Sequence, residues 1–433
     1  MFEYDGVQGQ AETVSWTLYE YRADDQLRMV TDTRNNQTTI GYDLLGRRRT
    51  LADPDTGLTQ YDYDANGNLL TQTDAAGQTL RWSYDELDRP DVRRIGGPSG
   101  PIDSDWDYDT APGGIGALAR RSDGAGVYSR TSYDAVGRPT GERYDVAGRS
   151  FSFTNAYDGL GQRTNRWYPT LPTAKQIRSD YDARGYLTGT SGMVATNGVE
   201  WDAQGRLTRW RTPAGATHTT SFDPVTGRLA EIRVTHPNGT VLEELDYGFD
   251  PGDRITTITD VQDGALTRGF QYWRSDRLRH ASGPQGGYYS YDPIGNILCK
   301  GSSSATQCTG AGAVAMTYPA AAGAPRPHAP LTVNGTPAGH GATGNLETLG
   351  TRRYGYDALG RLTTVRDDQR LLAEYAYDAS GRRARAVDHT GPRIGATRHL
   401  LADDFEWDET RKLARLHVSL GSTAVATYVE ALD

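Results

Sequence analysis

The sequence predicts an all-β protein, a long antiparallel strip of β-hairpin repeats with no helical segment of three or more turns. Three observations predict this fold. An aromatic residue followed by Asp recurs about every 21 residues, aromatic residues stand in pairs two positions apart, and Gly or Asp fills the expected turns. The 433 residues include 26 Tyr and 8 Trp, and the net charge is only −9. We therefore expect a folded chain with an aromatic core.

The aromatic anchors define the repeat. Their spacing is a constant 21 residues across Tyr21, Tyr42, Tyr63 and Tyr84. The series continues at Tyr108, Tyr133, Tyr157, Tyr181, Trp201, Phe222, Phe249, Tyr272 and Tyr291, and it returns at Tyr356 and Tyr377. Asp directly follows 13 of these 15 anchors, which chance does not produce. A repeat of this length without a helix can bury its aromatic face only against its neighbours.

The anchors belong to β-strands, because several carry a second ring two positions earlier. Residues two apart in a strand share one face of the sheet. The pairs are Tyr61 and Tyr63, Trp82 and Tyr84, Trp106 and Tyr108, Tyr289 and Tyr291, Tyr354 and Tyr356, and Tyr375 and Tyr377.

The residues after each anchor predict a hairpin turn. In the unit YDANGNL, the Asp64 side chain can accept a hydrogen bond from the backbone, and Gly67 supplies the positive φ of a three-residue loop with a bulge. This loop places Tyr63 opposite Leu69 and Asp64 opposite Asn68. The equivalent pairs are Trp201 with Leu207, Asp202 with Arg206, Tyr356 with Leu362, and Asp357 with Arg361.

The two faces of such a hairpin have different chemistry. One face stacks an aromatic ring on Leu, and the other pairs Asp with Arg. The chain has 43 Arg against 3 Lys. This bias fits the arrangement, because a guanidinium can fork across to a carboxylate and lie flat on neighbouring rings.

Where the turn lacks Gly, Asp takes its place, at Asp25, Asp88, Asp253 and Asp276. Asp is among the few residues that tolerate the left-handed region, so we expect positive φ at most of these positions. A second turn follows about ten residues after the first, as in residues 53–57 and 73–77. Each repeat therefore has two strands and two turns.

We predict that residues 1–433 form a single repeat array. Regular units fill residues 14–298 and 351–385. Between them, residues 299–350 contain an Ala/Gly/Pro-rich insertion, which is either a flexible linker or, as we prefer, two degenerate units around Tyr318 and the turn at 341–345. Residues 386–433 lack the motif and still alternate apolar and polar residues around a Gly421–Ser422 turn, which predicts further hairpins.

The motifs resemble the YD repeats of the RHS family over nearly the whole chain. They are YDLLGRRRTLADP, YDANGNLL, YDAVGRPTG, WDAQGRLTRW, YDPIGNIL, YDALGRLTTV and YDASGRRARAV. The resemblance implies a twisted, spiralling strip that forms part of a hollow shell. In bacterial polymorphic toxins and the C component of insecticidal toxin complexes, such a shell encloses a C-terminal toxin domain. In the more distantly similar teneurins it is an adhesion module.

The chain departs from the complete family pattern. The core end with its DPxG-type motif, the toxin domain and an export signal are not found in the sequence, so no catalytic residue is carried over. We therefore expect a fragment of a larger bacterial protein that is secreted or displayed at the cell surface by signals outside this chain. Its implied partners are neighbouring shell segments and an enclosed toxin domain of the same or an associated polypeptide.

No pattern in the chain predicts an enzyme. We find neither an HExxH motif nor a GxSxG nucleophile elbow, and we expect no catalytic, cofactor-binding or metal-binding residue. The His residues without metal-ligand spacing are His218, His236, His280, His328, His340, His389, His399 and His417.

Two acidic patterns have an alternative interpretation as cation sites. DYDANG matches the start of an EF-hand loop at Asp62, Asp64, Asn66 and Gly67, but the twelfth position is Thr73 and strands are expected on both sides. The hairpin already explains those residues. A second cluster would hold a cation or mark a contact surface, and we expect it to be a solvated turn. Its members are Asp403, Asp404, Glu406, Asp408 and Glu409.

The remaining features bound the environment. Cys299 and Cys308 either pair with each other in an oxidising compartment or remain two thiols, and the sequence leaves both open. No apolar run is long enough to cross a bilayer. Charges of both signs are interspersed, so no basic face is expected to bind nucleic acid.

The leading hypothesis is a non-catalytic shell segment that encloses and helps deliver a toxin domain. The alternative is a cell-surface adhesion or carbohydrate-binding module, because exposed Tyr, Trp and Arg side chains can bind glycans. A third possibility is that the segment alone has no activity and self-associates through its exposed strands.

Overall fold

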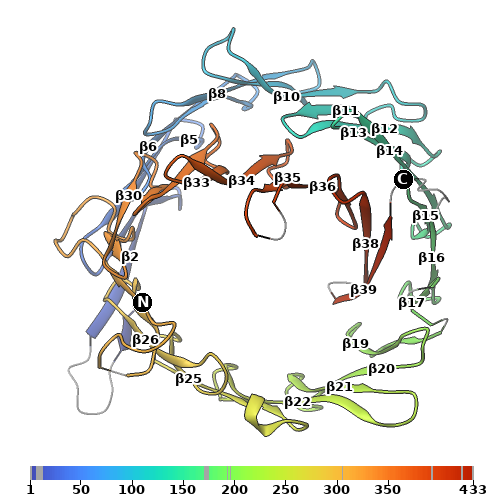
Figure 1. Cartoon of the computed structure of the whole chain (residues 1–433). Coiled ribbons are helices and arrows are strands. Elements are labelled where there is room, and N and C mark those ends of the chain that lie inside the picture. The colour runs from blue at the N-terminus through green and yellow to red at the C-terminus, as the bar shows by residue number, and fades with distance from the viewer. Residues whose placement is uncertain are drawn as a thin grey trace. The chain divides into compact units, whose positions relative to one another are not determined.

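The structure is a computed structural model, and it describes residues 2–5, 13–169, 175–192, 194–195, 197–304, 306–391, 394–420 and 423–431. The described chain is almost entirely antiparallel β-sheet, as predicted, and its single helix is the three-residue 3₁₀ turn η1 (Gly264–Leu266) (Figure 1). No helix in the described part of the chain is long and apolar enough to cross a membrane.

The chain divides into two compact units. Unit 1 comprises Met1–Arg89, Arg93–Pro101 and Tyr247–Arg370, and unit 2 comprises Pro90–Val92, Ile102–Asp246 and Leu371–Asp433. Within each unit, successive strands pair as antiparallel neighbours. The single repeat array over residues 1–433 remains a prediction.

Unit 1 contains most of β1 to β9 and of β23 to β33. Their bounds are β1 (Phe2–Asp5), β2 (Thr13–Tyr21), β3 (Leu27–Asp32), β4 (Gln37–Tyr42), β5 (Arg48–Asp53), β6 (Gly57–Tyr63), β7 (Leu69–Thr73), β8 (Thr79–Tyr84), β9 (Pro90–Ile95), β23 (Ile255–Asp260), β24 (Arg268–Tyr272), β25 (Leu278–Ala281), β26 (Gly287–Tyr291), β27 (Ile297–Ser302), β28 (Val314–Thr317), β29 (Thr332–Val333), β30 (Thr336–His340), β31 (Leu346–Leu349), β32 (Arg352–Tyr356) and β33 (Leu362–Asp367).

Unit 2 contains β10 to β21, most of β22, and β34 to β39. Their bounds are β10 (Ile102–Tyr108), β11 (Leu118–Asp123), β12 (Gly126–Tyr133), β13 (Pro139–Val146), β14 (Arg149–Tyr157), β15 (Arg163–Trp167), β16 (Gln176–Tyr181), β17 (Leu187–Thr190), β18 (Val199–Trp201), β19 (Leu207–Arg211), β20 (Thr217–Phe222), β21 (Leu229–Thr235), β22 (Val241–Phe249), β34 (Arg370–Tyr377), β35 (Arg383–Asp388), β36 (Ala396–Ala402), β37 (Phe405–Asp408), β38 (Leu413–Leu420) and β39 (Thr423–Ala431).

The turn that follows each anchor, which we call the YD turn, has the predicted geometry. Tyr63 lies opposite Leu69 with a register shift next to it. The backbone N–H of Asp64 donates to the Asn68 carbonyl at 3.0 Å, and Gly67 has φ of 97°. The same pairings occur between Trp201 and Leu207 and between Tyr356 and Leu362. The predicted bulged hairpin is confirmed.

Asp does replace Gly at the left-handed turn position. Asp25, Asp88, Asp253 and Asp276 have φ between 60° and 67°. The second turn of each repeat, which we call the return turn, is also present, with Gly57 at φ of 77° and Gly77 at φ of 75°. The predicted two strands and two turns per repeat are confirmed.

The anchors form a ladder from one repeat to the next. The Tyr63 hydroxyl donates to the Arg48 carbonyl at 2.9 Å, and the Tyr84 hydroxyl donates to the Leu69 carbonyl at 2.9 Å. The guanidinium of Arg47, from the preceding YD turn, lies 4.9 Å from the centre of the Tyr63 ring. Hydroxyl bonds to the preceding repeat recur at Tyr42, Tyr133, Tyr157, Tyr181, Tyr272, Tyr291 and Tyr356.

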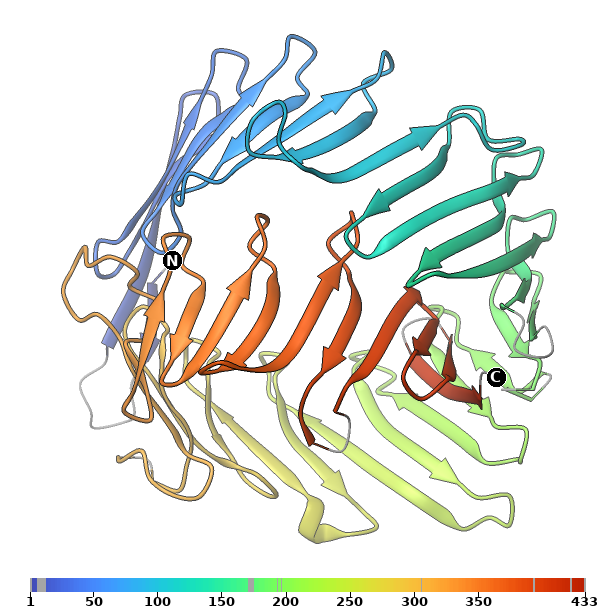
Figure 2. The same cartoon turned by 45° about the horizontal axis from the view of Figure 1, so that its top comes forward.

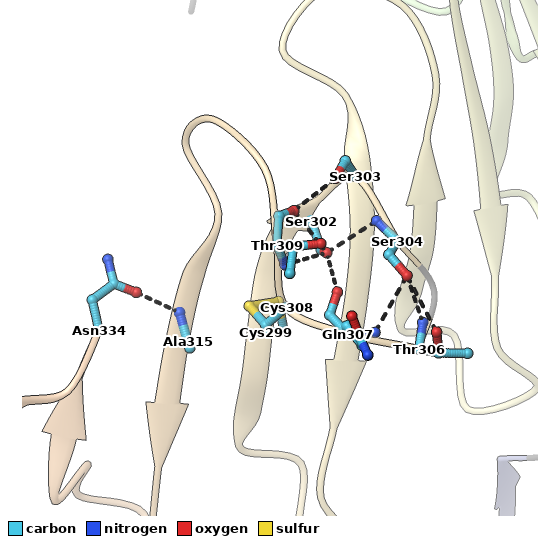
Figure 3. Close-up of a disulfide and its surroundings, with 10 residues drawn as sticks. All are labelled: Cys299, Ser302, Ser303, Ser304, Thr306, Gln307, Cys308, Thr309, Ala315 and Asn334. Carbon is cyan, nitrogen blue, oxygen red and sulfur yellow. Dashed lines mark hydrogen bonds between the residues drawn. A yellow bond between two sulfur atoms is a disulfide. The ribbon is translucent and has the colours of Figure 1, made fainter.

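The segment with the widened repeat interval contains strands and a long loop. Gly341 and Asn345 close the predicted turn between β30 and β31, with Gly344 at φ of 80°. The inserted loop runs between β28 and β29. Before it, Cys299 and Cys308 form a disulfide with a Cα–Cα distance of 5.7 Å (Figure 3). This settles the alternative that the sequence left open.

The largest core lies in unit 2, where the C-terminal hairpins of β36 to β38 pack on β13, β14 and β16. Figure 2 shows these hairpins, in dark red, beside the green strands of the same unit. Phe153, Phe405, Trp407 and Leu416 are at most 3% exposed there. The β38–β39 hairpin is the predicted hairpin without a YD motif, although its Gly421–Ser422 turn lies outside the described residues.

Candidate functional site

Beside this core, the C-terminal hairpins and the strands β12 to β17 enclose a polar cavity of about 720 Å³. We call it the unit 2 cavity. Its lining includes five arginines, Arg121, Arg130, Arg163, Arg166 and Arg382, and four acids, Glu142, Asp378, Asp403 and Asp404. It is the candidate site because it concentrates charge beside the best-packed part of the unit.

The centre of the charge network is Asp404, in the turn between β36 and β37. Its carboxylate accepts a hydrogen bond from the Tyr168 hydroxyl at 2.6 Å and lies 3.5 Å from Arg166 Nε. Arg166 also donates to Asn155 Oδ1 at 3.0 Å and lies 3.6 Å from Glu142. The two contacts of Asp404 join residues more than 230 positions apart in sequence.

Burial and charge shift the ionisation of this group. Burial, together with the negative charge of Asp404, raises the pKa of the Tyr168 hydroxyl. Burial opposes the charge on Arg166, but Asp404 and Glu142 outweigh it and raise the pKa of the guanidinium. Tyr168 therefore stays protonated and Arg166 charged, so the network holds as an ion pair with a neutral hydroxyl donor.

A second network joins the YD turn at Asp378 to the return turn at Asp123. Arg121 donates to Asp378 at 2.8 Å, and the Ala379 backbone N–H donates to Asp123 at 2.7 Å. Burial raises the pKa of Asp123. Burial also opposes ionisation of Asp378, but its hydrogen bond from Ser380 and the nearby Arg121 lower the pKa. Arg382 completes this network through a 2.6 Å contact with Asp403.

A third group in the cavity lining consists of Tyr128, Tyr144 and Arg130. The two tyrosine rings lie 4.8 Å apart, and Arg130 donates to the Tyr128 hydroxyl at 3.0 Å. Burial, followed by the proximity of Tyr128 and Glu142, raises the pKa of Tyr144. Arg130 therefore lies beside tyrosine hydroxyl groups in this part of the cavity.

The arrangement neutralises charge and links strands. Each of the four cavity carboxylates faces an arginine or an amide donor. The described lining holds one histidine, His417, whose Nδ1 lies 3.1 Å from Thr427 Oγ1. Arg166 Nε, Asp404 Oδ1 and Thr190 Oγ1 are buried without a hydrogen-bond partner, which leaves polar atoms for water to bind. These hydrogen bonds and ion pairs cross-link two layers of unit 2, the C-terminal hairpins and the strands on which they pack.

The acidic cluster at residues 403–409 contradicts the prediction of a solvated turn. Only Asp403 is fully solvated, at 97% side-chain exposure, whereas Glu406 is 13% exposed and Asp408 is completely buried. Glu406 contacts Arg415 at 2.6 Å. The prediction failed because strand alternation places Glu406 and Asp408 on the face of β37 opposite Phe405 and Trp407, where Arg415 lies 2.6 Å from Glu406 and 3.9 Å from Asp408. The sequence alone does not show this partner.

The EF-hand-like residues serve the hairpin. Asp64 accepts hydrogen bonds from the backbone and side chain of Asn68, Asp62 pairs with Arg49 at 2.8 Å, and Asn66 donates to Asp88. Thr73 contacts Thr79 across the next turn. Within the described ranges, no group of three or more His, Cys, Asp or Glu side chains could hold a metal ion.

Three histidines have acidic partners that sequence analysis missed. His399 lies 3.0 Å from Glu409, His389 lies 2.9 Å from Glu374, and His328 lies 2.6 Å from Asp55. The first two pairs lie across adjacent strands, and the strand registers could have suggested them. The third joins residues 273 positions apart, for which the sequence carries no signal.

Comparison with protein-family models decides the repeat type. The RHS Repeat model matches residues 63–102 and 201–241, which include the anchors Tyr63, Tyr84, Trp201 and Phe222. These two segments therefore match RHS repeats. The two matched segments lie in regular parts of the predicted array.

Curated proteins that are similar to this chain include two toxin proteins. It is 24% identical over 439 residues to Double-stranded DNA deaminase toxin A of Burkholderia cenocepacia, covering 88% of this chain and 28% of the relative. It is 26% identical over 313 residues to Toxin subunit YenC2 of Yersinia entomophaga, covering 70% of this chain and 26% of the relative. The chain thus spans about a quarter of the length of these relatives.

Solved structures share the fold of this chain. A TcdB2–TccC3 crystal structure matches all of this chain and 26% of its own, with a TM-score of 0.82 at 17% identity. The Tc holotoxin pore of Photorhabdus luminescens matches all of this chain and 25% of its own, with a TM-score of 0.83 at 18% identity. The all-β hairpin fold expected from the YD motifs is therefore that of Tc toxin chains.

Proposed function

We propose that this RHS chain is a non-catalytic wall segment of a shell that encloses and shields a toxin domain. The observation that carries the proposal is the anchor ladder. The aromatic rings and the turn arginines contact the neighbouring repeat, and the turn carboxylates bind the arginine or asparagine of their own turn. Because the same residue types pack each repeat on the next, the repeats form a continuous wall. Such a wall fits enclosure of a toxin domain better than catalysis.

The relatives and the candidate site support the same role. The named relatives are toxins, and the RHS chain matches about a quarter of each, which leaves the rest of those proteins for a toxic activity. In the unit 2 cavity, carboxylates and arginines offset one another across 2.6 to 3.6 Å contacts. This arrangement resembles a structural cross-link, and we propose that it fastens the C-terminal hairpins to the wall.

We propose further that residues 1–433 act as one array, next to shell segments and a toxin domain of the same or an associated polypeptide. We place the protein outside the bacterial cytosol, secreted or at the cell surface. The Cys299–Cys308 disulfide supports this location, because disulfides persist in oxidising compartments.

The test of containment is the protection of a cargo. A folded reporter with an internal site for a specific protease is fused after Asp433, and the cleavage rate is compared with that of the free reporter. We expect cleavage at least about tenfold slower in the fusion. A matched fusion with a 60-residue Gly/Ser spacer should restore cleavage, because the cargo can then leave the wall. Equal rates in all three proteins would contradict the proposal.

The adhesion alternative predicts a different result. A glycan array probed with the purified chain should show no binding if the anchors are committed to the ladder. Selective binding to a glycan class, lost on substitution of exposed aromatic residues, would favour an adhesion module instead.

A further inference from the structure

Unit 1 contains a cleft of about 960 Å³ whose lining comes from two segments far apart in sequence. One wall is formed by residues between 56 and 82, on β6 to β8 and their turns, and the other by residues between 343 and 360, which include β31 and β32. We call it the unit 1 cleft. Beside it, a Cβ on Gly344 would come within 2.8 Å of the Asp55 carbonyl oxygen. The two walls are therefore in direct contact next to the cleft.

Two aromatic rings line the unit 1 cleft, Trp82 on β8 and Tyr354 on β32. Each is the second ring of an aromatic pair, two positions before the anchors Tyr84 and Tyr356. The anchors belong to the ladder, because their hydroxyls donate to carbonyls of the preceding repeat at 2.9 and 2.8 Å. The side chains of Trp82 and Tyr354 have no hydrogen-bond or ring-stacking partner among the described residues. The ladder therefore leaves these two rings available to a ligand.

Second rings of other pairs lie against a guanidinium. Arg48 lies 4.7 Å from the centre of the Tyr61 ring, and Arg383 lies 5.1 Å from the centre of the Tyr375 ring. Each of these arginines stands six positions after an anchor. Around the two rings of the cleft, the positions six after an anchor, with His340 in the place of one anchor, are apolar, namely Leu69, Pro90, Leu346 and Leu362. The rings of the cleft thus lack the arginine that covers their equivalents.

Two carboxylates of the unit 1 cleft have no cationic partner in the part of the chain that the structure describes. Glu347 is exposed on β31, and the register of β31 with β32, continued by one pair, places it opposite Tyr354. On the other wall, Asp74 Oδ1 accepts from the backbone N–H groups of Ala76 and Gln78, both at 2.9 Å. Asp74 Oδ2 accepts no hydrogen bond from the described residues. Both carboxylates can therefore bind a cation from solution.

The other charged groups of the lining already have partners. Asp357 accepts a hydrogen bond from Arg361 of its own turn at 2.6 Å. Arg353 donates to the Gly350 carbonyl at 2.9 Å. The described lining holds three carboxylates and one guanidinium, so the cleft keeps a negative charge after Arg361 is counted.

Negative charge beside open aromatic faces is the chemistry that binds organic cations. The face of an aromatic ring is the negative end of its quadrupole, so it attracts an ammonium or guanidinium group. A carboxylate beside the ring adds a charge-assisted hydrogen bond from the N–H groups of that cation. A metal ion fits less well, because no group of three or more His, Cys, Asp or Glu side chains in the described ranges could hold one. A neutral ligand would leave the charge of both carboxylates uncompensated.

We infer that the unit 1 cleft binds an organic cation, an alkylammonium or guanidinium group, against the rings of Trp82 and Tyr354. Glu347 and Asp74 supply the counter-charge. The ligand takes the place that an arginine side chain occupies over Tyr61. Free polyamines carry such a group, and so do the lysine and arginine side chains of polypeptides. The inference concerns a ligand site and stands whether or not the shell encloses a toxin.

The test is isothermal titration calorimetry of the full chain with two cationic probes. Spermidine represents a free polyamine, and a pentapeptide of alternating glycine and arginine with blocked ends represents basic side chains. A neutral alkyl diol is the control without charge. We expect one or both cations to bind and the diol not to bind. The probe that binds more tightly identifies the source of the cation.

Variants separate the cleft from non-specific attraction. Glu347→Gln should weaken binding of the tighter cation about tenfold, and Trp82→Leu should weaken it about threefold to tenfold. Glu86→Gln, in the exposed turn after Tyr84, removes the same charge outside the lining and should keep the wild-type affinity. The melting temperature of each variant checks that it is folded. Equal losses in Glu347→Gln and Glu86→Gln, equal binding of the diol, or no binding of either cation up to about 10 mM would overturn the inference.

Discussion

The arginine of the YD turn acts on two repeats at once. Arg206 bonds its own turn aspartate, Asp202, at 2.7 Å. It also donates to the Gly227 carbonyl of the next turn at 2.8 Å and lies 3.9 Å from the centre of the Phe222 ring. The backbone N–H and guanidinium of the equivalent Arg47 lower the pKa of Asp43, so the turn carboxylate stays ionised. One side chain thus shapes a hairpin and fastens it to its neighbour.

We expect Arg206→Ala to destabilise the chain by about 1–2 kcal/mol, because it removes a charged hydrogen bond and a cation–π contact between repeats. Arg206→Lys should lie between Ala and wild type, since a lysine keeps the charge but not the planar fork. The measurement is urea unfolding followed by tryptophan fluorescence. Arg49→Ala, which breaks the exposed pair with Asp62, is the control and should cost less than about 0.5 kcal/mol. Equal effects at both sites would contradict the ladder.

His399 is a second residue with a measurable signature. It is 3% exposed, stacks on Trp407 at 4.9 Å and contacts Glu409 at 3.0 Å. Burial lowers its pKa below 6.5, with Arg385 acting in the same direction and Glu409 opposing. The unfolded chain takes up a proton near pH 6.5, and the folded chain does so only at lower pH. Stability should therefore fall as the pH drops below about 6.5.

The expected result is a smaller loss of stability on acidification in His399→Gln than in wild type. The difference is at most one proton, or about 1.4 kcal/mol per pH unit. Urea unfolding at pH 7.5, 6.5 and 5.5 measures it. A steeper slope in His399→Gln would show that the histidine is protonated in the fold.

At the scale of elements, the C-terminal hairpins differ from the repeats in what holds them. Repeats are joined by sequential ladders, whereas β36 to β38 pack face to face on β13, β14 and β16 through buried aromatic rings. Phe405 lies 5.4 Å from Phe153, and Trp407 lies 4.9 Å from Phe151. Apolar burial holds the layers, and the Asp404 network at the edge fixes their register.

Trp407→Ala should destabilise unit 2 by about 3–5 kcal/mol, because a residue that is 1% exposed leaves a cavity against Phe151. Hydrogen exchange should rise in β14 as well as in β37, because the two elements share the cavity. Val429→Ala on β39, at a side chain that is 52% exposed, is the matched control and should change little. Faster exchange confined to β37 would mean that the hairpins are not coupled to the wall.

The disulfide is a local staple. It joins residues nine positions apart. Between them, the buried Ser302 hydroxyl donates to the Gln307 carbonyl and accepts from the backbone N–H of Thr309, which directly follows Cys308 (Figure 3). Loop-closure entropy assigns such a link about 2–3 kcal/mol. Cys299→Ser with Cys308→Ser should lower the melting temperature of unit 1 and abolish its response to reductant. A wild-type melting curve unaffected by reductant would contradict this.

Local elements could be predicted because their determinants are local. The YD turns need one aspartate and one residue with positive φ, and both are visible in the motif, including the Asp25 and Asp88 variants. The Asp404 network could not be predicted, because Arg166 and Tyr168 lie more than 230 residues away. The burial of Asp408 was also missed, because a run of acidic residues predicts a solvated turn when the residues that pack on it are unknown.

At the scale of the whole molecule, contacts between distant segments bear on how the chain survives cleavage. In unit 1 the loop after β28 bonds back to the first strands, where Arg326 N donates to the Pro54 carbonyl at 2.9 Å and His328 contacts Asp55. In unit 2 the C-terminal hairpins pack on β13 to β16. Each unit therefore contains segments from both sides of the exposed stretch around Ala321 and Gly323.

A chain cut within that stretch should remain one particle. A specific protease site inserted between Ala321 and Gly323 separates residues before it from those after it. Contacts such as His328 with Asp55 in unit 1 and Trp407 with Phe151 in unit 2 still join the two fragments. We expect two fragments on a denaturing gel and an unchanged elution volume on native gel filtration. The cut chain carrying Trp407→Ala and His328→Ala, which weaken one contact between the fragments in each unit, should separate at lower urea than the cut wild type. Spontaneous separation of the cut wild-type fragments would show that sequential pairing alone holds the chain together.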